Sequence, residues 1–156
     1  MATKKPTASA ASIEFTAPST GGDFTLSAHQ GKPVVVYFYP KDNTPGCTTE
    51  SQQFRDLHAE FAGLGATVVG VSRDSLKSHQ GFKAKFELPF ELLSDADEKL
   101  CQQFEVIKMK NMYGKQVRGI ERSTFLFDSG GRLVREWRKV KVDGHAREVL
   151  EAVKAL

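Results

Sequence analysis

The residue best placed to do chemistry in this sequence is Cys47, which ends the segment 40–47, PKDNTPGC. The six residues before this segment, VVVYFY, are β-branched and aromatic without polar alternation, which predicts a strand buried on both faces. Thr44 and Pro45 are typical of the N-cap and the first position of a helix. Cys47 is therefore expected in a first helical turn, where backbone N–H groups and the helix dipole stabilise a nucleophilic thiolate.

Other interpretations of this segment stay open. A buried, inert cysteine is the alternative for Cys47, because apolar neighbours disfavour the thiolate, and Glu50 one turn on also works against it. Thr44 places a hydroxyl beside the sulfur, caps the helix, or does both. A thiolate also needs a cation to hold it and to polarise a substrate, and the candidates are Arg118, Arg122 and Arg73. Arg122 is the best placed, since it precedes a strand expected within the sheet, although most arginines are solvated surface residues.

Composition and charge exclude several classes of function. Two cysteines and four scattered histidines do not make a disulfide scaffold or a zinc site, so we expect no metal, and His79 is expected to be a hydrogen-bonded core residue. The net charge of +3 includes Lys4 and Lys5 near the N-terminus, which leaves no basic stripe for nucleic acid. The longest apolar run is six residues, whereas a membrane helix needs about twenty.

Residues 1–12, MATKKPTASAAS, contain lysines but no apolar segment typical of a secretory signal. Their composition predicts a disordered tail. Residues 13–156 suit a single domain, given a total length of 156 residues. The sparse cysteines indicate a reducing compartment, so we expect a cytoplasmic protein.

The remaining sequence predicts an α/β domain whose mixed sheet has helices on both faces. A helix from Pro45 carries one apolar stripe, and strand 67–71 follows it, parallel to the first strand. Residues 105–120 give no clear assignment. The stripe consists of Phe54, Leu57, Phe61 and Leu64. The other expected elements are extended stretches at 13–15 and 24–26, a helix from Ser75, a strand at 90–93, a helix at 96–104, a hairpin of 123–127 and 132–138, and a last helix around 146–153.

Residues 35–50, VVYFYPKDNTPGCTTE, resemble the active-site signature of the peroxiredoxins, and more narrowly of the peroxiredoxin Q or bacterioferritin comigratory protein subfamily. The family pattern PxxxTxxC falls on Pro40, Thr44 and Cys47. The family's active-site arginine falls on Arg122, within GIERSTFL at residues 119–126. The resemblance runs from about residue 13 to the end and implies a thioredoxin-like fold, with a central mixed sheet flanked by helices.

The resemblance also implies an activity, the reduction of hydrogen peroxide and organic hydroperoxides through a sulfenic acid on Cys47. Thr44, Arg122 and backbone N–H groups would bind the peroxide oxygens and stabilise the leaving oxygen. Pro40 would shield the sulfenate. No metal or organic cofactor is implied, and the expected partner is thioredoxin or a similar thiol reductant of a monomeric enzyme.

The second cysteine departs from the commonest pattern of that subfamily. Many relatives carry a resolving cysteine five residues after the first, where this chain has Gln52. Others place it on a later helix, which matches Cys101. A disulfide needs the two Cα atoms within about 7 Å, so this pairing would require local unfolding around both helices. The alternative is that Cys101 is a small buried hydrophobe and an external thiol resolves Cys47.

Two hypotheses from other classes of function remain open. One is a redox-sensing or chaperone-like module that passes its oxidation to a partner protein. The other is a thiol–disulfide oxidoreductase on the same fold, against which the absence of a CxxC motif speaks.

Overall fold

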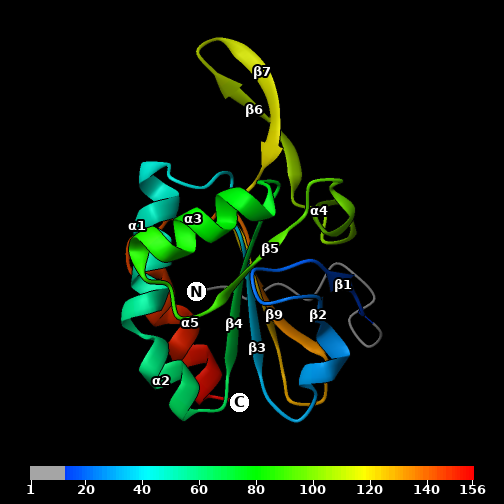
Figure 1. Ribbon diagram of the computed structural model, residues 1–156, viewed down its shortest axis with the longest axis vertical. Helices are drawn as coiled ribbons and strands as arrows, with labels where there is room; N and C mark the ends of the chain where they lie inside the picture. The colour runs from blue at the N-terminus through cyan, green and yellow to red at the C-terminus, as the bar shows by residue number, and fades with distance from the viewer. Residues whose placement is uncertain (1–12) are drawn as a thin grey trace.

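The structure is a computed structural model and describes residues 13–156, so the tail predicted for residues 1–12 lies outside the described residues (Figure 1). A five-stranded mixed sheet in the order β5-β4-β3-β8-β9 forms its centre. β3, β4 and β5 are parallel, while β8 and β9 pair antiparallel. The strands are β3 (Val34–Phe38), β4 (Thr67–Ser72), β5 (Glu91–Ser94), β8 (Ser123–Phe127) and β9 (Leu133–Trp137).

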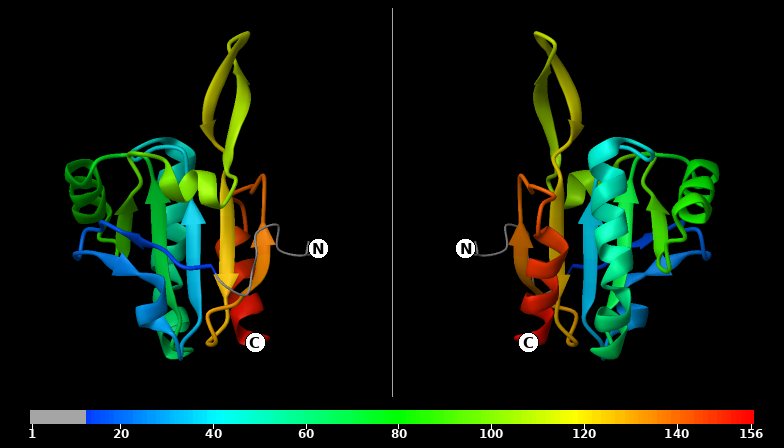
Figure 2. Two further views of the ribbon diagram at one scale, coloured as in Figure 1. Left: turned by 90° about the vertical axis from the view of Figure 1, so that its right-hand side faces the viewer. Right: turned by 90° about the vertical axis from the view of Figure 1, so that its left-hand side faces the viewer.

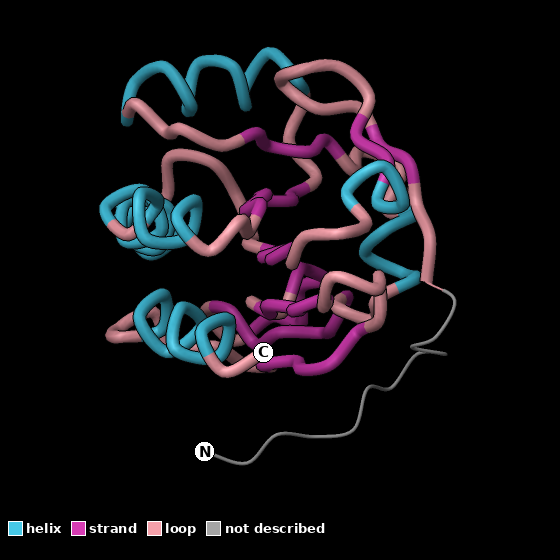
Figure 3. Tube along the Cα trace, turned by 90° about the horizontal axis from the view of Figure 1, so that it is seen from below, coloured by secondary structure: helices cyan, strands magenta, loops and turns pink. Residues whose placement is uncertain are grey.

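Helices cover both faces of this sheet unequally (Figure 3). One face carries the four longer ones, and the other carries two short helical segments together with a small pair of strands. The α/β class with helices on both faces is therefore confirmed. The first group is α1 (Pro45–Asp56), α2 (His58–Gly63), α3 (Leu76–Phe86) and α5 (His145–Lys154). The second is β1 (Thr16–Ala17), β2 (Phe24–Thr25), the 3-10 helix η2 (Leu26–His29) and α4 (Lys99–Gln103).

The central strand β3 is buried along its whole length, as the apolar run predicts. Tyr37 on this strand stacks on Phe54 of α1, with ring centroids 4.6 Å apart. Its hydroxyl lies 2.8 Å from the hydroxyl of Ser51, also on α1. Gly70 on β4 leaves room for the ring, since a Cβ there would lie 2.8 Å from the Tyr37 Cζ. These contacts fix α1 against the sheet directly behind the turn that carries Cys47.

Three predicted elements have different bounds in the structure. The single helix expected from Pro45 is wrong, because the chain leaves helical geometry at Leu57 (φ −98°, ψ 1°) and α2 restarts at His58. The helix expected over 96–104 is shorter, because Glu98 has a left-handed backbone (φ 64°) directly before α4. The first extended stretch lies at Thr16–Ala17 rather than at 13–15.

The unassigned residues 105–120 form a hairpin of β6 (Ile107–Met112) and β7 (Lys115–Ile120) that projects from the body of the domain (Figures 1 and 2). Tyr113 and Gly114 form its turn, and both have positive φ, 54° and 79°. Such turns suit the twist of a hairpin and favour glycine. The Gly114 turn was the available signal, but the first four residues of β7 are all exposed, so that strand shows no clear apolar alternation. Within residues 13–156, no helix combines the length and apolarity needed to span a membrane.

Candidate active site

Cys47 lies in the first turn of α1, reached from the carboxyl end of β3 through the loop of residues 39–44. Thr44 occupies the N-cap position with extended backbone, and Pro45 is the first helical residue, both as predicted. The Thr44 hydroxyl, however, donates to the carbonyl oxygen of Lys41 (2.7 Å), and no side-chain cap forms. The cap position of Thr44 is therefore confirmed, whereas a capping role of its hydroxyl is wrong.

Arg122, in the connection between β7 and β8, joins the two polar groups of this site. Its Nη2 donates to the Cys47 Sγ at 3.4 Å, and its Nη1 donates to the Glu50 Oε1 at 2.6 Å. Gly46 permits this approach, because a Cβ at that position would lie 3.2 Å from the same Nη2. Of the three candidate arginines, Arg122 is thus the one that the structure brings to the sulfur.

Glu50 is a part of this site that the sequence indicated only as unfavourable to a thiolate. Its side chain is fully buried, and burial raises its pKa to about 7, with the Arg122 guanidinium opposing that rise. The second carboxylate oxygen, Oε2, has no hydrogen-bond partner among the described residues. The ion pair could not be found from sequence, because it joins residues far apart in the chain through the order of the strands.

The other two candidate arginines both bind Glu98 instead of the sulfur. The Arg73 Nη1 lies 2.9 Å from the Glu98 Oε2, and Arg118 makes a salt bridge to the same oxygen. Lys110 on β6 is a further cation near the site, and its ammonium donates to the Ile120 carbonyl oxygen. Burial lowers the pKa of Lys110, the Arg122 charge acts in the same direction, and Cys47 opposes both. Lys110 was missed because its segment had no predicted structure.

Cys101 lies on α4, within the apolar core on the opposite face of the sheet from Cys47. Its side chain is fully buried, and burial, followed by the neighbouring Asp95, raises the pKa of its thiol well above the ordinary value. Both cysteines are free thiols. The position on a later helix agrees with the expectation for Cys101, while its resolving role stays a prediction.

Access to the Cys47 sulfur is narrow. Cys47 is 1% exposed, although Pro45 and Gly46 directly before it are exposed. Pro40, at the start of the loop, is half-buried. A pocket of about 850 Å³ opens at the foot of the β6–β7 hairpin, but Cys47 is not among its lining residues. The arrangement suits attack on a small molecule that reaches the sulfur, with a thiolate beside a fixed guanidinium.

Comparison with known proteins agrees with this geometry. The family model described as the AhpC/TSA family matches residues 8–136. The chain is 61% identical over 137 residues to the peroxiredoxin Bcp of Xanthomonas campestris, covering 88% of this chain and 86% of that protein. It is 54% identical over 134 residues to the peroxiredoxin Bcp of Bacillus subtilis, covering 86% and 85%.

A solved structure shows the same fold. It is the Xanthomonas campestris bacterioferritin comigratory protein, whose structures with a trapped intermediate and a ligand address its alkyl peroxide reduction activity. The TM-score is 0.85 at 58% identity, and the match covers 90% of each chain. This similarity confirms the thioredoxin-like α/β fold of the peroxiredoxins. The chain therefore belongs to the AhpC/TSA family, within the group of the Bcp or Q peroxiredoxins.

Proposed function

We propose that this protein is a thiol peroxidase in which Cys47 is the nucleophile and hydrogen peroxide and organic hydroperoxides are the substrates. The observation that carries the proposal is the 3.4 Å contact between Arg122 Nη2 and Cys47 Sγ in the first turn of α1. A guanidinium and a helix N-terminus both stabilise a thiolate, which is the reactive form of cysteine. The peroxiredoxin relatives, one of them with alkyl peroxide reduction activity, support the same chemistry.

The reaction follows from these groups. The Cys47 thiolate attacks the terminal oxygen of ROOH, so an S–O bond forms while the O–O bond breaks. The terminal OH stays on sulfur as a sulfenic acid, and RO⁻ leaves and takes up a proton from solvent to give ROH. Arg122 stabilises the charge that develops on the leaving oxygen, together with the backbone N–H groups of the turn. Thr44 contributes once its hydroxyl proton turns from the Lys41 carbonyl oxygen to the substrate. Pro40 shields the sulfenic acid.

A second thiol then attacks the sulfenic sulfur, giving a disulfide and water. Cys101 is the internal candidate for this thiol, and its use would require α4 to unfold and release it from the core. The burial of Cys101 on the opposite face of the sheet favours the second candidate, an external thiol that forms a mixed disulfide with Cys47. In either route a further thiol, from thioredoxin or a similar reductant, returns Cys47 to its reduced form.

Two further features of the proposal follow from the same residues. Cys47, Arg122 and Glu50 all come from one chain, which is consistent with a monomeric enzyme. A catalytic cycle based on free thiols needs a reducing compartment, so we place it in the cytoplasm.

The direct test is the Cys47→Ser variant, with Cys101→Ser as the matched control. A serine hydroxyl is barely ionised near neutral pH, so Cys47→Ser should lose peroxide reduction while keeping its fold. Cys101→Ser should consume its first equivalent of peroxide at nearly the wild-type rate. Stopped-flow consumption of hydrogen peroxide measures both. Substantial peroxide reduction by folded Cys47→Ser would contradict the assignment.

A further inference from the structure

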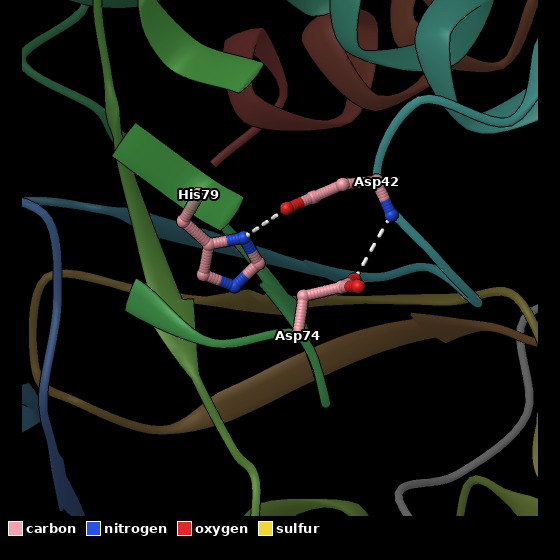
Figure 4. A group of neighbouring side chains, drawn as sticks. All are labelled: Asp42, Asp74 and His79. Atoms are coloured by element: carbon pink, nitrogen blue, oxygen red, sulfur yellow. Dashed lines mark hydrogen bonds and ion pairs between the residues drawn. The ribbon is translucent and has the colours of Figure 1, made fainter. Parts of the chain in front are cut away.

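A buried polar cluster outside the peroxide site touches the loop that leads to Cys47. Its members are Asp42 in that loop, Asp74 after β4, and His79 on α3 (Figure 4). Asp42 is 4% exposed and His79 is 0% exposed. Burying polar groups costs free energy unless they are hydrogen-bonded, and apolar side chains would fill the same space without that cost. We therefore ask what these groups do for the loop.

Asp42 and His79 are joined by a side-chain hydrogen bond. The His79 Nδ1 lies 2.7 Å from the Asp42 Oδ2, and the His79 Nε2 lies 2.9 Å from the carbonyl oxygen of Leu93. The ring is therefore held at both of its nitrogens. Burial alone would raise the pKa of Asp42, but the hydrogen bond from His79, followed by that from Tyr39, holds this pKa below its usual range.

The contacts favour a hydrogen-bond network over a metal site. Both ring nitrogens of His79 and the Oδ2 of Asp42 are already engaged in hydrogen bonds, so these ligand atoms are in use. The Asp74 Oδ2 likewise accepts the backbone N–H of Asp42 at 2.9 Å and the hydroxyl of Ser72.

The network anchors the loop to three separate elements. Asp42 is tied to the end of β4 through Asp74, and to α3 and β5 through His79. The next residue, Asn43, has a left-handed backbone (φ 64°), and Thr44 then begins α1. A residue in this region of backbone space is unfavourable unless its surroundings hold it. The anchor at Asp42 thus secures the turn that places Cys47 three residues beyond Thr44.

We propose that Asp42 and His79 are positioning residues, which hold this loop and the first turn of α1 in the conformation that reacts with peroxide, and whose separation lets a second thiol reach oxidised Cys47. The proposal rests on the thiol-peroxidase function of Cys47. In the anchored state the sulfur is 1% exposed, so a thiol on a larger molecule reaches it only after the segment moves. The two half-reactions therefore favour opposite states of the loop.

The test separates these half-reactions in His79→Gln and Asp42→Asn, each in a Cys101→Ser background that leaves Cys47 as the single thiol. Stopped-flow measurement gives the rate constant for oxidation of Cys47 by hydrogen peroxide, and a second mix gives that for reduction of the sulfenic acid by dithiothreitol. We expect the first to fall by about ten-fold or more, because the reacting groups lose alignment. The rate constant for reduction of the sulfenic acid should rise. A variant that had only lost folded protein would not show such a rise.

The matched control is His145→Gln, which also removes a buried histidine with a hydrogen bond, 2.8 Å from its Nε2 to the Thr124 hydroxyl. Both of its rate constants should match those of the parent. The effect of the Asp42→Asn/His79→Gln double variant on each rate constant should be smaller than the product of the two single effects, because the two residues share the contact between His79 Nδ1 and Asp42 Oδ2. Should His79→Gln not fold, Ser78→Ala removes one hydrogen bond to Asp42 (2.8 Å) and should shift both rate constants in the same directions by a smaller amount.

Three results would count against the inference. Folded variants with both rate constants at the parent values overturn it, and so do variants with both rate constants lowered. Failure of Cys47 to oxidise in the parent protein overturns the proposed function and the inference with it, so the two failures are distinguishable.

Discussion

Arg122 contacts both the Cys47 sulfur, the proposed nucleophile, and the Glu50 carboxylate, whose charge works against a thiolate. Its planar fork reaches both through different nitrogens, which a single ammonium group does not reproduce. Glu50 orients this fork, and it also adds a negative charge one turn from the thiolate. Glu50 therefore holds the Arg122 guanidinium in place, and the guanidinium in turn reduces the effect of the Glu50 charge on the sulfur.

Arg122→Lys tests the geometry of this contact, because it keeps the charge and removes the fork. Oxidation of Cys47 by peroxide should slow by about ten-fold or more, since a lysine cannot hold both Glu50 and the sulfur. Stopped-flow kinetics with hydrogen peroxide measures the rate constant. Arg118→Lys is the control, because Arg118 binds Glu98 on the surface. Equal rate constants for Arg122→Lys and the wild type would remove Arg122 from the mechanism.

Glu50→Gln tests the protonation of the buried carboxyl. Burial raises the pKa of Glu50 in the folded protein to about 7, from an ordinary value of 4.5. A raised pKa means that the folded state binds this proton more tightly than the unfolded state. The resulting stabilisation is complete below about pH 4.5 and is lost as the pH rises through about 7, a change of about 3 kcal/mol.

The free energy of unfolding of Glu50→Gln, relative to wild type, should therefore rise between about pH 4.5 and about pH 7, the two pKa values of Glu50. Urea denaturation at each pH gives this difference. His145, whose pKa burial lowers to about 4, acts in the opposite direction, but it is present in both proteins and cancels. A difference that stays constant with pH would show that Glu50 does not titrate in this range.

At the scale of elements, the stability of the short helix α4 determines whether the Cys101 thiol can reach oxidised Cys47. The carboxylate of Asp95 accepts the backbone N–H groups of Leu100 and Cys101, at 3.0 and 2.8 Å. These bonds close the start of a helix of five residues, which has little stability of its own. We therefore expect Asp95 to limit how often the Cys101 thiol leaves the core.

Asp95→Ala should destabilise α4 by about 1–3 kcal/mol, because two buried N–H groups lose their acceptor. Labelling of Cys101 by a thiol reagent should accelerate by about ten-fold for each 1.4 kcal/mol by which opening becomes easier. Asp97→Ala is the control, since Asp97 is exposed and contacts Lys99, accepting its backbone N–H at 3.3 Å and lying 3.8 Å from its ammonium. Equal labelling rates in the two variants would mean that Asp95 does not restrain the helix.

Across the whole molecule, the sequence predicted best where local pattern and burial agree. The apolar run of β3 and the Thr44–Pro45 helix start both lie where they were expected, and together they place Cys47. The β6–β7 hairpin projects from the domain, so its residues carry no core-facing pattern, and Lys110 was missed with it. The Glu50–Arg122 and Asp42–His79 pairs depend on which strands become neighbours, and local patterns along the sequence do not reveal that order.

The central claim is that Cys47 is the residue that peroxide oxidises, and one measurement tests it most directly. Wild-type protein receives one equivalent of hydrogen peroxide, remaining thiols are blocked, and tandem mass spectrometry maps the oxidised sulfur. The account predicts that every oxidised molecule is modified at Cys47, either as a trapped sulfenic acid with Cys101 still a thiol or as a Cys47–Cys101 disulfide. Oxidised molecules in which Cys47 remains a free thiol would contradict it.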